Sequence, residues 1–291
     1  MDNTEDFLRR CQAGENIHVS AYLMRRSDQE RIEGALVAYQ SGHHSLGNAI
    51  IQTLNSPDAA HCIERVLSHP QMFPSASKIA TQIINTVGFS SLIALTLAQH
   101  NNTVGLRFLL ENNHLGDLNG PQTKQKQNTY SAALGAARHG ALQALNVLAP
   151  APTPEHIDAF VRESLRENVC AVVKHFYTEI PDDNLSGALQ AALKHKDQEL
   201  VELIVHSVEH KSNRIVLLSG IMEACLRAEW TTPVHKFAQH NPSDIKPIWK
   251  MMQKLQDKTA SRFEEFLSYH QKDLLKRSIE ETPTSSPPRK L

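Results

Sequence analysis

Apolar residues recur at helical spacing along almost the whole chain, whereas the strict alternation typical of a half-buried strand is rare. Polar cap signals interrupt this pattern at short intervals. The stretch Ser27-Asp28-Gln29-Glu30 has the sequence of a capping box, in which the serine and the glutamate each satisfy a free amide at a helix start. Further predicted starts are Ser56-Pro57, Thr153-Pro154, Asp182-Asp183, Thr232-Pro233 and Ser243-Asp244. The spacing predicts helices of about 10 to 15 residues joined by brief polar turns, which is a chain of helical hairpins.

One hairpin unit recurs along the middle of the chain. Its clearest copy spans residues 131–149, where an alanine-rich first helix is followed by the polar turn Arg138-His139-Gly140 and by an aliphatic second helix. Weaker copies in the same register span residues 92–110, 159–177, 187–205 and 220–238. Their equivalent positions are Ala98, Ala137, Leu165, Leu193 and Leu226, at intervals of 39, 28, 28 and 33 residues. Such a period indicates an array of stacked supersecondary units.

The unit resembles the helix–turn–helix core of an ankyrin repeat, a family in which small residues on the first helix let the second helix approach closely. The resemblance covers roughly residues 90–240, and its intervals bracket the period of about 33 residues typical of that family. The 28-residue steps leave too little room for the long finger hairpin of a standard repeat, and the T-P-L-H signature is absent. The resemblance implies an all-α solenoid of stacked antiparallel helical hairpins with shortened or missing fingers, which binds another protein.

The regions outside the repeats are also expected to be helical. We interpret residues 1–89 as an N-terminal helical cap or as degenerate repeats. An amphipathic pattern in residues 241–279 predicts C-terminal capping helices. The polar stretch 113–129 predicts an extended loop, and the low-complexity composition of residues 280–291 predicts a disordered tail.

Composition narrows the class of function. Hydrophobic residues make up 41% and charged residues 21% of the chain, as in a folded soluble protein, and an aromatic fraction of 5% suits thin helical layers. The formal net charge of -1 provides no general attraction to nucleic acid. No apolar run approaches the ~20 residues of a membrane span, and the first residues lack the pattern of a secretory signal. We therefore expect a cytoplasmic protein with no nucleic-acid partner.

The cysteines point to a reducing compartment rather than to catalysis. Cys11, Cys62, Cys170 and Cys225 lie far apart without a CxxC pair, which argues against a disulfide framework and a zinc ribbon. Cys170 and Cys225 fall inside repeat helices and are expected to be small buried side chains. Cys11 follows two arginines, whose charges would lower the pKa of its thiol. No nucleophile with an activating partner is evident, so we predict no catalytic residue and no cofactor.

The chain contains 16 histidines, which raises the question of metal binding. His206 and His210 have the i,i+4 spacing that places two imidazoles on one helix face, but no third ligand is implied, so no metal site is predicted. His100, His139 and His195 fall at the same position of three repeat units, where the first helix ends. A protonated ring there would interact favourably with the helix dipole, and the rings would also line one ridge of a solenoid. Both roles, helix capping and partner binding, stay open.

A row of basic residues follows the last repeat. Lys246, Lys250, Lys254, Lys258 and Arg262 are each four positions apart, so on a helix they wind slowly as a stripe. Because the stripe flanks an apolar face, the solvent side of a capping helix is its simplest interpretation. The alternatives are contact with an acidic partner or with anionic lipid headgroups.

The end of the chain has a composition of its own. Residues 278–291 bear Glu, Ser, Thr and Pro and end on a leucine. This tail resembles the C-terminal translocation signals of effectors that intracellular bacterial pathogens export by type IV secretion. The resemblance implies delivery into a host cell cytosol, and an unstructured tail without that role is the alternative.

The leading hypothesis is a non-enzymatic scaffold that binds another protein, which for an effector would be a host protein. The residues predicted to contact this partner are His100, Arg138, His139, Lys194 and His195. The alternative is an effector enzyme whose site lies in the first 90 residues, and a pocket that joins a cysteine or histidine to a carboxylate would favour it. A third hypothesis is membrane association through residues 244–279.

Overall fold

The computed structural model describes residues 4–15, 23, 25–73, 75–89, 91–180, 182–209 and 211–254. All regular secondary structure in these residues is helical, which confirms the predicted all-α class. The chain divides into two compact units, Met1–Glu179 (unit 1) and Ile180–Leu291 (unit 2). The boundary between them falls inside the range 90–240 over which the hairpin pattern recurs.

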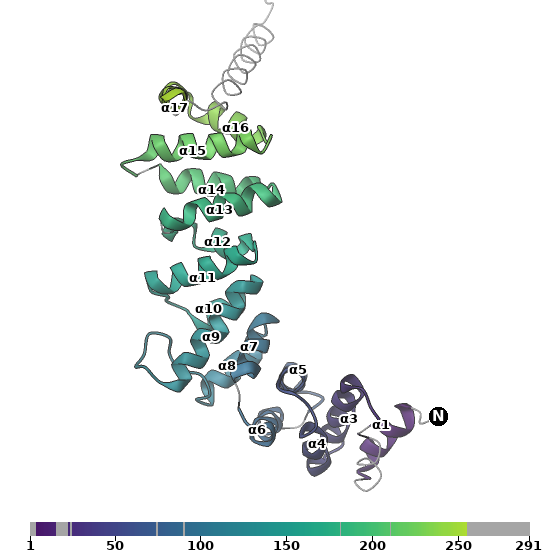
Figure 1. Cartoon of the computed structure of the whole chain (residues 1–291). Coiled ribbons are helices and arrows are strands. Elements are labelled where there is room, and N and C mark those ends of the chain that lie inside the picture. Colours follow the sequence, from purple (N-terminus) through teal and green to yellow (C-terminus); the bar gives the residue numbers. More distant parts are fainter. Residues whose placement is uncertain are drawn as a thin grey trace, which may run out of the picture. The chain divides into compact units, whose positions relative to one another are not determined.

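Unit 1 consists of consecutive helices joined by short connections (Figure 1). Their bounds are α1 Thr4–Ala13, α3 Asp28–Gln40, α4 His44–Ile51, α5 Ser56–Ser68, α6 Ala76–Val87, α7 Ser91–Gln99, α8 Thr103–Glu111, α9 Lys124–His139, α10 Leu142–Leu148, α11 Pro154–Arg166 and α12 Cys170–His175, followed by a 3-10 turn at Tyr177–Glu179. The helices pair in chain order as α3–α4, α5–α6, α7–α8, α9–α10 and α11–α12. The first helices of successive pairs pack on one another from α3 to α11, and so do the second helices α8, α10 and α12.

Small residues allow the first helices of unit 1 to approach closely. Helices α7 and α9 pack on each other and bury Ala94, Ala98 and Ala136 completely. At Gly34 of α3, an added Cβ would lie 2.6 Å from the fully buried ring of Phe7 on α1. Substitution by any larger residue at such a contact would force the two helices apart.

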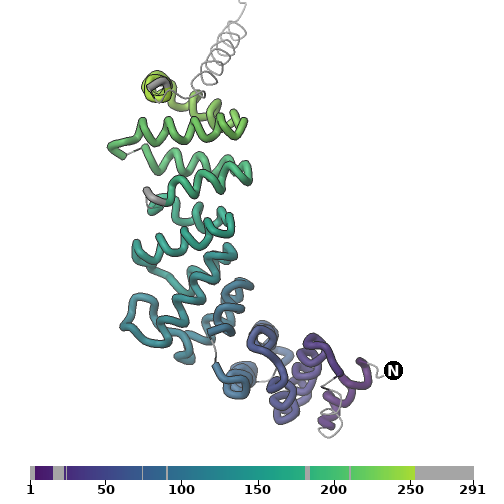
Figure 2. The backbone as a smooth tube through the Cα atoms, viewed as in Figure 1, coloured from purple at the N-terminus to yellow at the C-terminus, as the bar shows by residue number. Residues whose placement is uncertain are grey.

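Unit 2 continues the succession of helix pairs (Figure 2). Its helices are α13 Asp182–His195, α14 Gln198–Val208, α15 Arg214–Arg227, α16 Thr232–His240 and α17 Pro242–Lys254. Helix α13 pairs with α14 and α15 with α16, while α17 packs on both α15 and α16. An ion pair between Arg214 and Asp244 ties α15 to α17. Ile248 and Met252 of α17 are buried, so the apolar face of this helix is used inside the unit.

The same turn joins the two helices of six pairs. In each turn one residue adopts a left-handed conformation, with φ between 50° and 81°. The amide of the next residue then donates to the carbonyl five residues earlier, at 2.8 or 2.9 Å. This arrangement is the Schellman motif, which satisfies carbonyls that a helix end leaves free. The left-handed residues are Gly42, Asn101, Gly140, Asn168, Lys196 and Glu229.

Five of these turns confirm the hairpin turns predicted from the sequence, because each left-handed residue lies three positions after an equivalent residue of the repeat. The sixth, at Gly42, extends this register to α3 and α4, which lie in the region that sequence analysis could not assign to it. Helices α5 and α6 are joined by a longer connection. The turn therefore recurs in both units.

The predicted helix starts are confirmed at two sites and are wrong by one or two residues at others. Ser27 and Glu30 form the expected capping box, and Thr153 caps α11 before Pro154. At α5, however, the capping side chain belongs to Asn55, which accepts a hydrogen bond from the Asp58 amide at 2.9 Å. Helix α16 has Thr231 at its N-cap instead of Thr232, and α17 begins at Pro242, so that Ser243 lies inside it.

The loop predicted at 113–129 is shorter than expected. Helix α9 begins at Lys124, because the Thr123 side chain accepts a hydrogen bond from the Lys126 amide and starts the helix there. The connection between α8 and α9 is held down from within: the fully buried Thr129 hydroxyl donates to the Gly116 carbonyl at 2.8 Å. Leu115 of this connection is also buried.

The left-handed turns give a first test of the fold. A non-glycine residue in this conformation is strained by roughly 1–2 kcal/mol, so Lys196→Gly and Glu229→Gly should each stabilise the protein by up to about that amount. Gly140→Ala should destabilise it, since φ at this residue is 69° and a Cβ would lie 2.8 Å from Val169. Urea unfolding followed by circular dichroism measures both effects, and a loss of stability in the two glycine variants would contradict the assignment of these turns.

The start of α11 should make stability depend on pH. His156 completes a capping box there, because its Nδ1 accepts a hydrogen bond from the Thr153 amide at 3.4 Å. Burial lowers the pKa of His156, and the charge of Lys126 lowers it further, so the folded state favours the neutral ring. The stability that this group provides is therefore complete above the unfolded pKa of about 6.5 and is lost as the pH falls below it.

His156→Gln keeps a hydrogen-bond acceptor but cannot be protonated. We expect the wild type to lose more stability than this variant between pH 7.5 and 5, as measured by urea unfolding midpoints. Thr153→Ala, which removes the cap, should cost about 1 kcal/mol at both pH values. Equal pH profiles of wild type and His156→Gln would exclude this role for the histidine.

Candidate protein-interaction surfaces

The five residues predicted to bind a partner all lie where the first helix of a pair ends. His100 directly follows α7, Arg138 and His139 end α9, and Lys194 and His195 end α13. All five side chains are exposed. Among the described residues, none of the three imidazoles has a hydrogen-bond partner. Their donors and acceptors therefore face solvent in this structure.

Arg138 differs from the other four because it already has a partner within the chain. Its guanidinium donates to Glu163 Oε2 at 2.8 Å, which links α9 to α11. The Glu163 side chain is only 12% exposed and also pairs with Arg166. Arg138 thus contributes to the packing of two successive first helices, and His139 beside it is more accessible to a partner.

An open polar groove lies in unit 1 between α3, α5 and α7, with a volume of about 500 Å³. Its polar lining includes Asp58, His61 and Glu64 of α5 and His100, which directly follows α7. His61 Nδ1 lies 3.5 Å from Glu64 Oε2, and these side chains are 45% and 38% exposed. The groove is therefore a hydrated acidic and imidazole-rich surface rather than an enclosed site.

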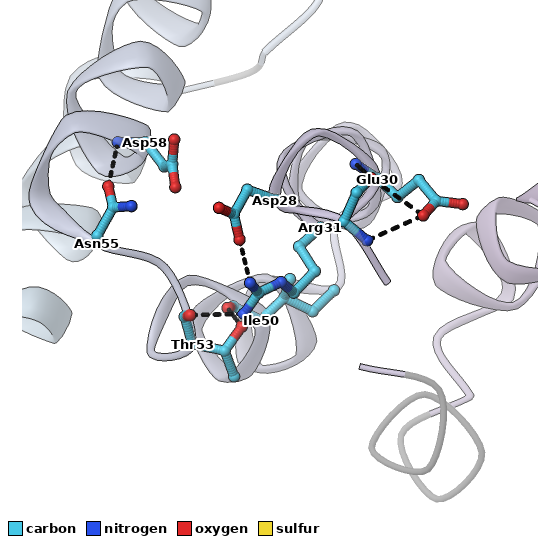
Figure 3. Close-up of polar contacts among 8 residues, drawn as sticks. Asp28, Glu30, Arg31, Ile50, Thr53, Asn55 and Asp58 are labelled. Carbon is cyan, nitrogen blue, oxygen red and sulfur yellow. Dashed lines mark hydrogen bonds and ion pairs between the residues drawn. The ribbon is translucent and has the colours of Figure 1, made fainter. Parts of the chain in front are cut away.

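Asp58 lies beside an ion pair of the neighbouring helix α3 (Figure 3). Its Oδ2 atom is buried and has no hydrogen-bond partner among the described residues. Burial raises the pKa of the Asp58 carboxyl, and the negative charge of Asp28 raises it further. The positive charge of Arg31 acts in the opposite direction and lowers the pKa of Asp58, although its guanidinium pairs with Asp28 and donates to the Thr53 carbonyl at 2.6 Å.

Unit 2 contains an apolar groove between α13 and α15, with a volume of about 370 Å³. In the part of unit 2 that the structure describes, these two helices lack the close packing that joins α7 to α9. Ile204 and Val208 of α14 form the floor of the groove. Its walls consist of Leu185, Ser186, Leu189, Gln190 and Leu193 from α13 and of Val216, Leu217, Gly220, Ile221 and Ala224 from α15. The lining residues are apolar or neutral, and Val216 is 52% exposed.

Gly220 is a helix-interior glycine without a packing role in this chain. A Cβ added there would meet no atom within 4 Å, whereas at Gly34 and Gly47 it would lie within 2.7 Å of a buried aromatic ring. Glycine inside a helix lowers its stability by roughly 0.5–1 kcal/mol relative to alanine. The wall of the groove is therefore open at Gly220 at the expense of helix stability.

Three of the described cysteines, Cys11, Cys62 and Cys225, are poor nucleophiles. Burial raises the pKa of Cys11 to about 11 and the pKa of Cys62 and Cys225 to about 12. The expectation of a lowered pKa at Cys11 is wrong, because the preceding arginines, Arg9 and Arg10, both pair with Asp6 at 2.7 Å and the thiol itself is fully buried. Cys170 is partly exposed at the start of α12.

Two further predictions fall partly outside the described residues. In the basic stripe, Lys246 and Lys250 are exposed on α17 and Lys254 ends that helix, while Lys258 and Arg262 lie outside the described residues. His206 contacts Glu209 at 3.0 Å, and His210 is not described. The described part of the chain contains no cluster of three or more His, Cys, Asp or Glu side chains that could hold a metal ion. It also contains no helix with the length and apolar character needed to cross a bilayer.

The sequence analysis missed the apolar groove of unit 2. The walls of this groove fall in or next to the repeat units predicted at 187–205 and 220–238, and a local signal was present only in Gly220, a glycine within a strongly apolar helical pattern. In comparisons with known proteins, no family model, no curated protein and no solved structure matches this chain.

Glycine substitutions distinguish the open groove from the packed helices. Gly220→Ala should stabilise the protein by roughly 0.5–1 kcal/mol, because the new methyl group meets nothing and the helix gains rigidity. Gly34→Ala, the matched control, should destabilise it by roughly 1–3 kcal/mol through overpacking against Phe7. Urea unfolding measures both changes, and destabilisation by Gly220→Ala would mean that another part of the chain fills the groove.

Proposed function

We propose that this chain is a non-enzymatic scaffold that binds another protein, built as an α-solenoid of ankyrin-like hairpins without finger hairpins. The observation that carries this proposal is the recurrence of one Schellman turn in six helix pairs, each of which leaves the end of its first helix exposed. Repeated turns of this kind present a series of similar side-chain positions. Proteins built from stacked repeats commonly use such extended surfaces to bind their partners.

The chemistry of the exposed positions fits protein recognition. His139 in unit 1 and Lys194 and His195 in unit 2 offer donors and positive charge without internal partners among the described residues. The apolar groove of unit 2 adds desolvated contact area, which supplies most of the affinity in protein interfaces. Protein interfaces commonly combine an apolar region with exposed polar and charged side chains, and this chain offers both.

The polar groove of unit 1 supports a second candidate, an enzyme. It joins His61 and His100 to the carboxylates of Asp58 and Glu64 in the N-terminal part of the chain. This candidate has less support, because the histidine and glutamate in contact are well exposed and the cysteines of the region have raised pKa values. An enzymatic function would require that the chain turns over a reporter substrate and that His61→Gln abolishes this turnover.

Two further roles stay predictions. Export as an effector into a host cell depends on residues 278–291, which lie outside the described residues. Membrane contact through the basic stripe depends in part on Lys258 and Arg262, which are also outside them. On α17 itself, Ile248 and Met252 are buried within unit 2, which does not favour insertion of this helix into lipid.

The proposed function is tested by affinity capture with quantitative mass spectrometry. Wild-type chain should enrich one or a few proteins reproducibly, and the triple variant His139→Glu, Lys194→Glu, His195→Glu should lose most of that enrichment while its thermal unfolding is unchanged. Lys78→Glu, an exposed charge reversal on α6, serves as the matched control and should retain every partner. Equal capture by the triple variant and the wild type would show that His139, Lys194 and His195 are not part of the binding surface.

A further inference from the structure

The groove between α13 and α15 has the form of a site for a helix. Its walls are two helices of one unit, and each carries apolar side chains at helical spacing: Leu185, Leu189 and Leu193 on one, and Val216, Leu217 and Ile221 on the other. A partner helix with apolar residues at positions i, i+3 or i+4, and i+7 presents a stripe that fills such a groove. An extended peptide would instead bring unpaired backbone amides into an apolar site, where they find no partners.

Gly220 indicates how closely the occupant approaches. Its missing side chain leaves open space at the wall, and no residue of this chain uses that space in the described structure. Glycines at helix crossings allow two backbones to come nearer than larger residues permit. Gly220 thus leaves room at the α15 wall for a second backbone to cross.

Positive charge at one end of the groove indicates that its occupant carries acidic residues. Lys194 lies one helical turn beyond Gln190 of the α13 wall and Lys196 lies in the turn that follows α13; both are exposed, and neither has an ion-pair partner among the described residues. Asp197, the acid next to them, already caps α14 by accepting a hydrogen bond from the Leu200 amide at 3.1 Å. Two unpaired ammonium groups beside an apolar groove favour carboxylates on whatever fills it.

We propose that the α13–α15 groove binds an amphipathic helix of a partner protein, with its apolar stripe in the groove and acidic residues beside Lys194 and Lys196. This inference rests on the proposed function and names the chemistry of its partner. The helix would cross α15 at Gly220. Its affinity would come from the buried apolar stripe, while the two lysines would set its direction and make binding sensitive to salt.

The test uses the 291-residue chain and a displayed library of 18-residue helices that have one apolar face and varied charges. Selection should enrich helices with acidic residues near one end, and synthetic peptides of these should bind with micromolar affinity in fluorescence anisotropy. Gly220→Leu, which fills the groove, and Val216→Glu should each weaken binding at least about tenfold. Lys194→Glu with Lys196→Glu should weaken binding and flatten its dependence on salt.

Matched controls lie elsewhere in the chain. Val104, which is 46% exposed on α8, matches Val216 in type and exposure, so Val104→Glu should leave peptide binding unchanged. Lys78→Glu is the corresponding control for Lys194 and Lys196 and should also leave peptide binding unchanged. Because Gly220→Leu adds a side chain in open space, it should unfold no earlier than the wild type, and its loss of binding would not reflect loss of structure.

Several outcomes would overturn the inference. The first is the absence of any enriched helix, and the second is equal peptide binding by Gly220→Leu and the wild type. The third is peptide binding that appears only in the Phe266→Glu variant, and the fourth is a dimer in light scattering that Gly220→Leu abolishes. The third would assign the groove to the chain's own C-terminal residues and the fourth to a second copy. A partner captured from cells that still binds Gly220→Leu would leave the proposed function intact, whereas the absence of any captured partner would contradict that function itself.

Discussion

The chain reversal in six of the helix pairs depends on one hydrogen bond, from the amide that follows a left-handed residue to the carbonyl five residues earlier. In five pairs the residue that donates this bond is also the N-cap of the next helix: His43, Asn102, Ala141, Val169 and Asp197. A link of two or three residues leaves the second helix little freedom to move away from the first. The helices of a pair must then pack closely, and the apolar residues of both are committed to one thin layer.

The unit 1 pairs and the unit 2 pairs use this layer differently. In unit 1 the first helices carry small residues where they meet, and α7 and α9 close on each other around buried alanines such as Ala98 and Ala136. In unit 2 the corresponding helices α13 and α15 carry leucines and a valine, and an apolar groove stays open between them. The turn is the same in both cases, so the size of the side chains between first helices decides whether a surface closes or stays accessible.

Local features of the sequence predicted the hairpins well and their connections less well. The helix period and the turn residues are both set by neighbours within a few positions, so the turns at Asn101 and Gly140 were found correctly. Two adjacent polar residues can each cap a helix, which explains why Asn55 and not Ser56 caps α5. The groove of unit 2 depends on how α13 and α15 pack across about 30 residues of chain, and Gly220 was the one local sign of it.

In the proposed function, the accessible surfaces would contribute differently to partner binding. Exposed ion pairs contribute about 0–1 kcal/mol each, so His139, Lys194 and His195 could orient a partner but could not hold it strongly. Buried apolar area provides about 25 cal/mol per Å², and among the described surfaces the α13–α15 groove offers such area without charged groups that would have to be desolvated. In the proposed complex, the lysines at its end would select among apolar helices by charge. Affinity from the groove and selectivity from Lys194 would then come from the same helix, since Gln190 of the groove and Lys194 lie one turn apart on α13.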